Sequence, residues 1–322
     1  MGFLRGVNLP YFFDAYGRDL APNALLAAGP FEVDPMAVYR PLLEAREIGF
    51  EAVRVWLCEG GEGLLMKDGE VSGIHPVLVE SVAILQECAH LCGLKLYWTL
   101  LDGHSWRRMN DSFTRSILAD PHHAARFAER VVTPLARRLE PKVTFAVEIV
   151  NAPEALTAEG AGEPRADAIS WDVLGMAIRT LGGAVRAEHG AILVSAGTSR
   201  RLLPLLWRSG AGVSAIDVHV GNPHGGIPSR EELATALQDQ RVRDRSIPLV
   251  AGCECVPEDL ESTAASVPLH ELASTAEREG YAAAFLGRLD GDYIDTTTPE
   301  RSFTTTAREM QTRRARLGST RD

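Results

Sequence analysis

The sequence has no apolar run long enough to cross a bilayer and no basic stripe. Its longest apolar stretches fall far short of the ~20 residues that a transmembrane helix needs, and charged residues interrupt them. The formal net charge of -10 argues against nucleic acid as a partner, because such binding requires clustered Lys and Arg. The basic cluster Arg313, Arg314 and Arg316 is interpreted as a solvated helix face. The sequence therefore predicts neither a nucleic-acid partner nor a membrane span.

Cysteine is scarce, with five residues in a chain of 322. An odd number without the spacing of a disulfide framework argues against a disulfide-stapled fold. No apolar signal segment precedes the first expected strand, so we expect a reduced, cytoplasmic setting. The five cysteines are Cys58, Cys88, Cys92, Cys253 and Cys255.

The sequence also lacks internal repeats and low-complexity linkers. Hydrophobic residues make up 45% of the chain, enough to bury a large core, and the length suits one eight-stranded α/β barrel. We therefore expect a single domain over residues 1–322, without a separate binding module.

Short β-forming runs alternate with longer segments of helical period, which is typical of β-α units around a parallel sheet. About eight such units occur, the number that a closed barrel requires. The sequence thus predicts an α/β fold, a single (β/α)8 TIM barrel. The expected strands are Leu4 to Leu9, Ala52 to Leu57, Lys95 to Leu101, Val143 to Val150, Ala191 to Ser195, Ala215 to Val220, Pro248 to Gly252 and Ala282 to Leu286.

Glu254 follows an expected strand of small apolar residues. A charge there either faces the barrel mouth or is buried without compensation, and the mouth costs less free energy. In a TIM barrel the loops after the strands build the active site. A carboxylate at this place can act as a nucleophile on an anomeric carbon. The alternative is a glutamate that only forms a salt bridge at the rim.

Arg54 and Trp56 share one face of the second expected strand, because successive strand side chains alternate. An inward arginine needs a carboxylate partner, and pairing with Glu254 would keep that carboxylate ionised. Trp56 would offer an apolar platform to a sugar. The alternative is an outward Arg54 that covers a helix.

Three further polar residues follow strands. Asn151 is placed to hydrogen-bond a sugar hydroxyl beside the reacting carbon, or else to cap the next helix. His104 and His219 are placed to position sugar hydroxyls or carboxylates, although a lone histidine is more often structural. A zinc site from Cys253, Cys255, His219 and His224 is disfavoured, because Cys-x-Cys is poor spacing for zinc. We therefore expect no metal and no cofactor.

Taken together, these residues resemble the barrels of glycoside hydrolase clan A, most closely the family 5 cellulase and mannanase group. The resemblance spans essentially the whole chain and implies activity on an oligosaccharide or glycoside. It implies an arginine on the second strand at Arg54, histidines after the third and sixth strands at His104 and His219, and a nucleophile after the seventh at Glu254. It also implies an Asn-Glu-Pro motif after the fourth strand.

That motif is changed in one letter, because the chain reads Asn151-Ala152-Pro153. The resemblance implies a general acid/base at the position of Ala152, whose methyl group cannot hold a proton, and it matches Glu148 to an acidic position often seen before the motif. It further implies retaining hydrolysis of β-linked gluco- or manno-configured oligosaccharides, with a glutamate at 152 as the acid and Glu254 as the nucleophile.

Two other departures concern sugar binding. Gly221 replaces the aromatic residue that usually follows the histidine after the sixth strand. No tryptophan occurs after Trp207, so Phe285 or Trp106 would have to supply the sugar platform.

Three interpretations of Ala152 follow. The glutamate was replaced deliberately to give an inactive variant, or the chain diverged naturally into a non-catalytic carbohydrate-binding barrel. In the third, Glu154 or another acid from the loop at 155–167 takes over, or the leaving group needs no protonation. A metal-dependent amidohydrolase is disfavoured, because Val7-Asn8-Leu9-Pro10 lacks a His-x-His pair.

Overall fold

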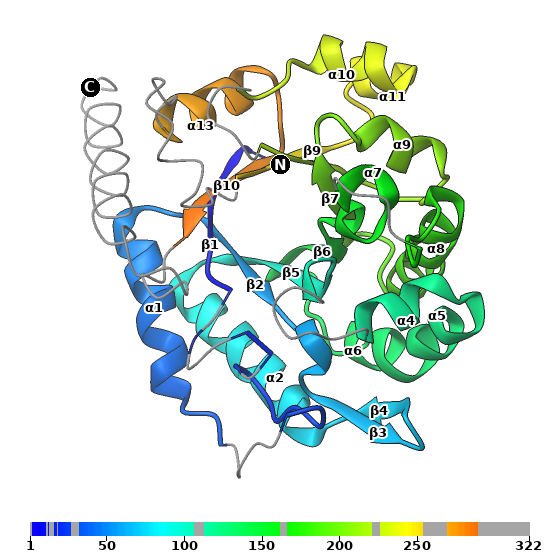
Figure 1. Cartoon of the computed structure of the whole chain (residues 1–322). Coiled ribbons are helices and arrows are strands. Elements are labelled where there is room, and N and C mark those ends of the chain that lie inside the picture. The colour runs from blue at the N-terminus through cyan, green and yellow to red at the C-terminus, as the bar shows by residue number, and fades with distance from the viewer. Residues whose placement is uncertain are drawn as a thin grey trace.

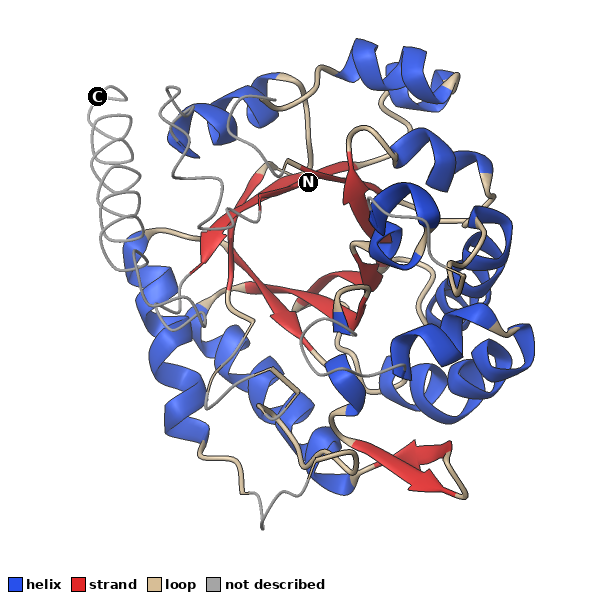
Figure 2. Cartoon of the chain, viewed as in Figure 1, coloured by secondary structure: helices blue, strands red, loops and turns tan. Residues whose placement is uncertain are grey.

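The computed structural model describes residues 2–10, 12, 16–17, 19–26, 32–105, 113–161, 166–220, 226–253 and 269–288. These residues form a closed barrel of eight parallel strands in the order β1-β10-β9-β8-β7-β6-β5-β2, with helices around it (Figures 1 and 2). The predicted TIM barrel is confirmed. The barrel strands are β1 (Leu4–Asn8), β2 (Ala52–Trp56), β5 (Lys95–Asp102), β6 (Thr144–Asn151), β7 (Leu193–Ser199), β8 (Ile216–His219), β9 (Leu249–Cys253) and β10 (Ala283–Arg288).

Each predicted strand overlaps one of these eight. Helices or helical turns follow most of them along the chain and cover the outside of the barrel (Figure 2). No helix of the described residues is both long and apolar enough to cross a membrane. The helices are α1 (Pro35–Ile48), α2 (Pro76–Cys92), α4 (Phe113–Ala119), α5 (Pro121–Phe127), α6 (Thr133–Ala136), α7 (Ala158–Ala161), α8 (Trp171–Glu188), α9 (Leu203–Arg208), α10 (Arg230–Leu237), α11 (Gln240–Arg243) and α13 (Leu269–Arg278), with the turns η1 (Glu59–Gly61), η2 (Ala128–Val132) and η3 (Pro153–Leu156).

The helix ends follow local chemistry. Asp34 caps α1 by accepting a hydrogen bond from the Met36 N–H at 2.9 Å, and a proline occupies the first helical position. Gly49 and Gly93 end α1 and α2 in the left-handed region, where glycine carries no Cβ penalty. The residues at and next to each cap therefore determine where these helices begin and end.

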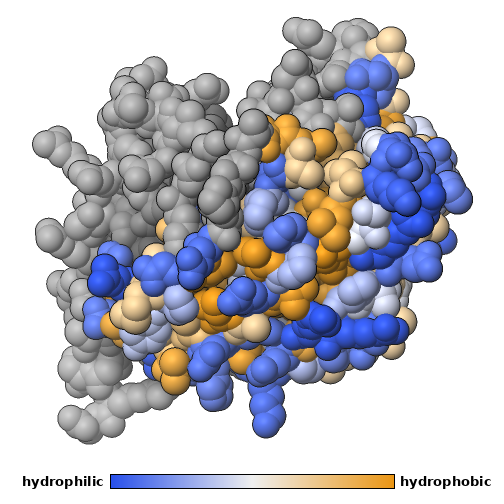
Figure 3. Space-filling model, turned by 90° about the horizontal axis from the view of Figure 1, so that it is seen from below, coloured by the Kyte–Doolittle hydropathy of each residue, from blue (hydrophilic) through white to orange (hydrophobic). Residues whose placement is uncertain are grey.

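A two-stranded hairpin, β3 (Leu64–Lys67) with β4 (Glu70–Ile74), lies outside the barrel. Its turn is Asp68-Gly69, and both residues have positive φ, the typical signal of a tight hairpin. Side chains of the hairpin, α4 and α5 line a surface pocket of about 280 Å³. Figure 3 shows the molecule from below, with apolar side chains among hydrophilic ones on this surface. None of the predicted site residues lines the pocket, so it is separate from the barrel mouth.

A small apolar cluster fills the lower part of the barrel. It is built from side chains of β2, β5, β6, β9 and β10. The Phe285 ring lies 4.9 Å from the Tyr97 ring, centroid to centroid, and covers Gly6 of β1. This layer is the floor on which the polar residues of the mouth rest. Its members are Ala52, Tyr97, Phe145, Ala146, Val250, Ala283 and Phe285.

We predict that Gly6→Ala destabilises the barrel by about 1–3 kcal/mol, because a Cβ at Gly6 would overlap the Phe285 ring in a closely packed layer. Urea denaturation measures the change. Gly183→Ala is the matched control, because nothing lies within 4 Å of a Cβ there and alanine favours the α8 helix by up to about 1 kcal/mol. Equal stability of the two variants would contradict this view of the packing.

Candidate active site

The polar residues at the carboxyl ends of the strands meet inside the barrel mouth. Arg54 of β2, Asn151 of β6 and His219 of β8 are all buried. Glu148 of β6 contacts Arg54 and His219, and Arg54 donates to Asn151. Parallel strands of a closed barrel end on the same rim, so residues far apart in sequence come together there. The structure thus brings these three residues together, and their roles in substrate binding stay predictions.

Arg54 points into the barrel and is 1% exposed. Its guanidinium pairs with Glu148 Oε2 at 2.5 Å, and it also donates to Asn8 Oδ1 at 3.2 Å and to Asn151 Oδ1 at 2.9 Å. The alternative of an outward Arg54 is therefore wrong. Where the sequence favoured Glu254 as the partner, the structure provides Glu148. Glu254 lies outside the described residues.

Glu148 is fully buried and accepts hydrogen bonds on both oxygens. Thr99 Oγ1 donates to Oε2 at 2.6 Å, and the Gly197 N–H donates to Oε1 at 3.1 Å. Burial alone would raise the pKa of Glu148, but the Arg54 guanidinium and the contacts with His219 and Thr99 outweigh it and lower the pKa to about 2. The surroundings of Glu148 thus favour its ionised form at the centre of the site.

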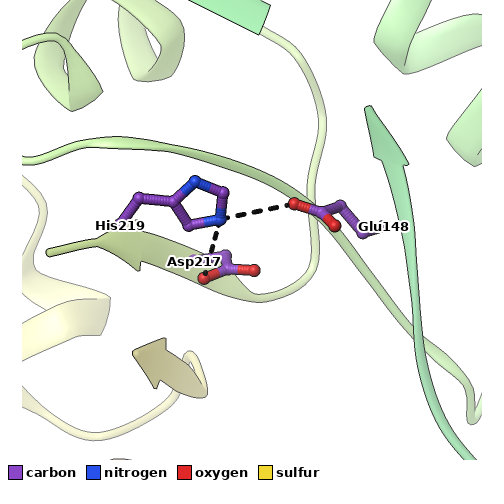
Figure 4. Close-up of side chains that lie close together, drawn as sticks. All are labelled: Glu148, Asp217 and His219. Carbon is purple, nitrogen blue, oxygen red and sulfur yellow. Dashed lines mark ion pairs between the residues drawn. The ribbon is translucent and has the colours of Figure 1, made fainter. Parts of the chain in front are cut away.

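His219 lies between two carboxylates, as Figure 4 shows. Its Nε2 is 3.5 Å from Glu148 Oε1 and 3.8 Å from Asp217 Oδ1. Burial alone would lower the pKa of His219, but these two carboxylates raise it to about 9. The imidazole therefore carries a proton at neutral pH.

Asp217 completes the cluster from two residues earlier on β8. Its Oδ2 accepts from the Tyr97 hydroxyl, which also lies 2.5 Å from Ser195 Oγ. Burial and the nearby Glu148 raise the pKa of Asp217 to about 6, although His219 and Arg54 act in the opposite direction. Asp217 was not predicted as a site residue, although strand alternation places it on the same face as His219.

Glu148, Asp217 and His219 also present donor atoms within 4.8 Å of one another, a spacing that a metal ion can use. Charge balance favours a proton instead. With His219 protonated, the two cations Arg54 and His219 match the two carboxylates. A divalent ion in place of that proton would leave the buried cluster with a net positive charge, which is costly in low dielectric.

Asn151 connects this cluster to the rim. It is fully buried, and its Nδ2 donates to Asp102 Oδ1 at 3.0 Å. Asp102 also accepts from the Tyr16 hydroxyl at 2.9 Å and from the His104 N–H at 3.1 Å. Asn151 therefore does not cap a helix, and the backbone of His104 is fixed beside it. Their contacts with a sugar stay predictions.

The two aromatic residues proposed as sugar platforms differ in position. Trp56 is 4% exposed, with its ring edge-to-face on Tyr16 and the Arg54 guanidinium over it. Phe285 is fully buried in the barrel floor, so its role as a replacement platform is wrong. The apolar character of an aromatic residue is consistent with either core burial or a sugar platform. Only its depth along the strand distinguishes these two roles. Trp106 lies outside the described residues, as do Cys255, His224 and Gly221 of the other sequence hypotheses.

Ala152 lies at the rim in the left-handed region, with φ 45° and ψ 55°. Its N–H donates to the Gly197 carbonyl at 3.0 Å, and its own carbonyl packs against Gly103. A residue with a Cβ in this region costs about 1–2 kcal/mol. The surrounding strands therefore hold residue 152 in a strained backbone conformation, as is common at functional sites.

Glu154, the proposed replacement acid, binds to the end of β7. Its Oε1 accepts from the Ser199 N–H at 2.9 Å, and its Oε2 accepts from the Thr198 hydroxyl at 2.8 Å. Both oxygens are therefore occupied as hydrogen-bond acceptors. Glu154 therefore fixes the loop after Ala152.

A second buried acidic group lies after β2 and was missed in the sequence. Glu62 Oε1 accepts the N–H groups of the backbone at 19–21, and Glu59 accepts from the Gly17 N–H at 3.4 Å. Burial is the largest effect on both acids. Burial and the Asp19 carboxylate raise the pKa of Glu62 to about 8, and burial with the charges of Glu62 and Asp19 raises the pKa of Glu59 well above its usual value. The sequence signal for this group is the glycine-rich run Cys58-Glu59-Gly60-Gly61-Glu62-Gly63, in which four residues have positive φ in the structure.

The fold is shared with known barrels. A β-1,4-D-mannanase from Cryptopygus antarcticus has 18% identity over 96% of this chain and 89% of its own, with a TM-score of 0.71. A β-mannanase from the blue mussel Mytilus edulis has 19% identity over 96% and 91%, with a TM-score of 0.70. A GH5_18 protein from Streptomyces cattleya, in complex with Manb1-4GlcNAc, has 17% identity over 93% and 74%, with a TM-score of 0.62.

No protein-family model and no curated protein matches the chain. At these identities the structural likeness shows the fold. The resemblance to the clan A, family 5 barrels that the sequence predicted is confirmed at that level.

We predict that Ala152→Gly stabilises the protein by up to about 1 kcal/mol, because glycine relieves the strain at φ 45° and offsets its own entropic cost. Thermal and urea denaturation measure the change. Ala184→Gly, at an ordinary position in α8, is the control and should destabilise by about 1 kcal/mol. A loss of stability in both variants would show that residue 152 is unstrained.

A second prediction concerns pH. Because the pKa of His219 is raised on folding from 6.5 to about 9, its stabilisation is fully present below pH 6.5 and is lost as the pH rises through about 9. The loss is roughly 3 kcal/mol. Chemical denaturation at pH 6 and pH 9.5 should show this fall in the unmodified chain and a smaller one in His219→Gln. His90→Gln, an exposed histidine on α2, should behave like the unmodified chain.

Proposed function

We propose that the chain is a retaining β-glycoside hydrolase in which the general acid/base position is held by Ala152. The observation that carries the proposal is the charge-balanced cluster of Arg54, His219, Glu148 and Asp217 at the barrel mouth, beside position 152. β9 ends at Cys253, which pairs with Leu286 of β10, and Glu254 is the next residue in the sequence. Two carboxylates facing one glycosidic bond are what retaining hydrolysis requires.

In this mechanism Glu254 attacks the anomeric carbon and forms a glycosyl ester, and water then releases the sugar. A glutamate at position 152 would protonate the departing oxygen and later deprotonate the water. Ala152 can do neither, so ordinary glycosides lose a contribution of roughly 10²- to 10⁴-fold in rate. Substrates with acidic leaving groups escape the first of these losses.

The substrate class follows from the neighbours in fold. Two are described as β-mannanases, and a third was solved with Manb1-4GlcNAc. We extend this to short β-linked manno- or gluco-configured oligosaccharides as substrates of this chain. No cofactor or metal enters the proposal, because a proton on His219 balances the buried carboxylates.

A second candidate is a carbohydrate-binding barrel without catalysis. It is favoured by the bonding of Glu154, which ties the nearest acid of the motif to Ser199 and Thr198. A deliberate replacement and a natural divergence at position 152 have the same chemical consequence, which is a site able to bind a sugar without an acid of its own there.

We predict that Ala152→Glu raises kcat/KM on β-1,4-manno- or gluco-oligosaccharides by roughly 10²- to 10⁴-fold, because it restores the proton donor. Ala152→Gln is the matched control, similar in shape but unable to donate as an acid, and should give no such gain. The unmodified chain should cleave 2,4-dinitrophenyl β-glycosides, and azide should yield the glycosyl azide with retained configuration. Glu254→Ala should abolish both reactions.

These measurements distinguish the hydrolase from the binding barrel. Binding of oligosaccharides in calorimetry, with no cleavage by Ala152→Glu or of the dinitrophenyl glycosides, would support the binding barrel and overturn the hydrolase. An azide product of inverted configuration would overturn the retaining mechanism.

A further inference from the structure

We propose that the side chains of Glu59 and Glu62 share one proton, and that this proton holds residues 19–23, called the strap below, against the barrel mouth. Loss of the proton at alkaline pH releases the strap. The proposal concerns a conformational switch and does not depend on the hydrolase function.

Glu62 is the anchor of the strap. It is fully buried, and its Oε1 accepts the N–H groups of Asp19, Leu20 and Ala21, those of Asp19 and Ala21 at 2.8 and 2.7 Å. Buried backbone N–H groups need an acceptor, and successive N–H groups that point at one oxygen favour negative charge there. This carboxyl group therefore takes the place of a helix or strand partner for the strap.

Glu59 begins the turn η1, and Glu62 directly follows that turn. Glu59 is 1% exposed, and its Oε1 accepts from the Gly17 N–H at 3.4 Å. The two glutamate side chains hydrogen-bond to each other, which two carboxyl groups do only when one carries a proton. Apart from this contact, no N–H or O–H group of the described residues donates to Oε2 of either glutamate, although both atoms are buried. The geometry therefore calls for a proton between them.

The electrostatics of the pair favour the same proton. Burial raises the pKa of Glu62 to about 8, with help from the Asp19 carboxylate, although the backbone N–H groups act in the opposite direction. Burial and the charges of Glu62 and Asp19 raise the pKa of Glu59, and the Cys58 thiol before η1 is kept neutral by burial and by both glutamates. Ionising both glutamates would place two like charges together in a buried site, which is costly.

The elements packed against η1 are α4 and β5. Arg115 of α4 pairs with Asp167, and Lys95 donates to a backbone carbonyl at the start of β5, the end away from the mouth. Asp102, at the other end of β5, accepts from the Tyr16 hydroxyl. The cations on these two elements thus lie in other contacts, so a proton is what neutralises the pair.

The strap connects the pair to the mouth. Asn23 Nδ2 donates to the Gly60 carbonyl at 2.9 Å and so ties the strap to η1. Tyr16, just before the strap, donates to Asp102 Oδ2 at 2.9 Å and lies edge-to-face on Trp56. Release of the strap therefore loosens the contact of Tyr16 with the rim.

Hydrogen exchange of the strap tests the proposal. An open strap leaves its glutamate with the ordinary pKa of 4.5, whereas the closed strap keeps the proton up to about pH 8. The contribution of the proton is therefore fully present below pH 4.5 and is lost as the pH rises through about 8. Mass spectrometry, corrected for intrinsic exchange rates, should show protection of the amides at 19–21 falling about tenfold per pH unit between pH 5 and 8 and then levelling off.

Glu59→Gln separates the proton from the fold. Its amide can donate permanently to Glu62, so the strap should stay protected at pH 8 and lose most of its pH dependence. Glu62→Gln is the second variant should Glu59→Gln fail to fold, because its amide can donate to the Glu59 carboxylate. Glu80→Gln, an exposed glutamate on α2, is the matched control and should keep the full pH dependence.

Three outcomes overturn the proposal. Strap protection in the unmodified chain that falls between pH 5 and 8 no more than protection of the β5 amides shows that no proton is shared. An unchanged pH dependence in Glu59→Gln shows that another group titrates. Protection restored at pH 8 by calcium ions shows that the pair binds a cation instead. None of these readouts uses a substrate, so failure of the hydrolase function leaves them unaffected.

Discussion

The ion pair between Arg54 and Glu148 is the interaction on which the mouth of the barrel depends. Both side chains are buried, and removing one partner of such a pair costs about 3–5 kcal/mol, because the other charge remains without compensation. The pair joins β2 to β6, which are separated by β5 in the barrel. Because the guanidinium also donates to Asn8 and Asn151, one cation orients three polar side chains at once.

The rest of the cluster follows from charge balance. Glu148 is kept ionised by Arg54, and an ionised Glu148 in turn favours the protonated form of His219 and helps to raise the pKa of Asp217 to about 6, which still leaves Asp217 a carboxylate at neutral pH. The protonation state that each group favours is therefore determined more by the neighbouring charges than by its own intrinsic pKa. The Tyr97 hydroxyl connects this polar layer to the apolar floor of the barrel, since its ring packs on Phe285.

The fold could be predicted because its signals are local: apolar runs, helical periods and caps such as Asp34 and Gly49 lie within a few residues of one another. The site could be predicted in part, since strand exits gather on one rim. The partner of Arg54 could not, because the irregular pairing of β6 with β7 between Glu148 and Asn151 breaks simple alternation. Phe285 was misjudged because its depth in the barrel depends on strand tilt and register, which no local pattern records.

Position 152 is set apart from this network. Its side chain is a methyl group, and the contacts of Arg54, Glu148 and His219 are made without it. The side chain at position 152 therefore does not set the electrostatics of the mouth. The strained backbone there is fixed by Gly197 and Gly103, so the strands continue to hold residue 152 at the rim whichever side chain it carries.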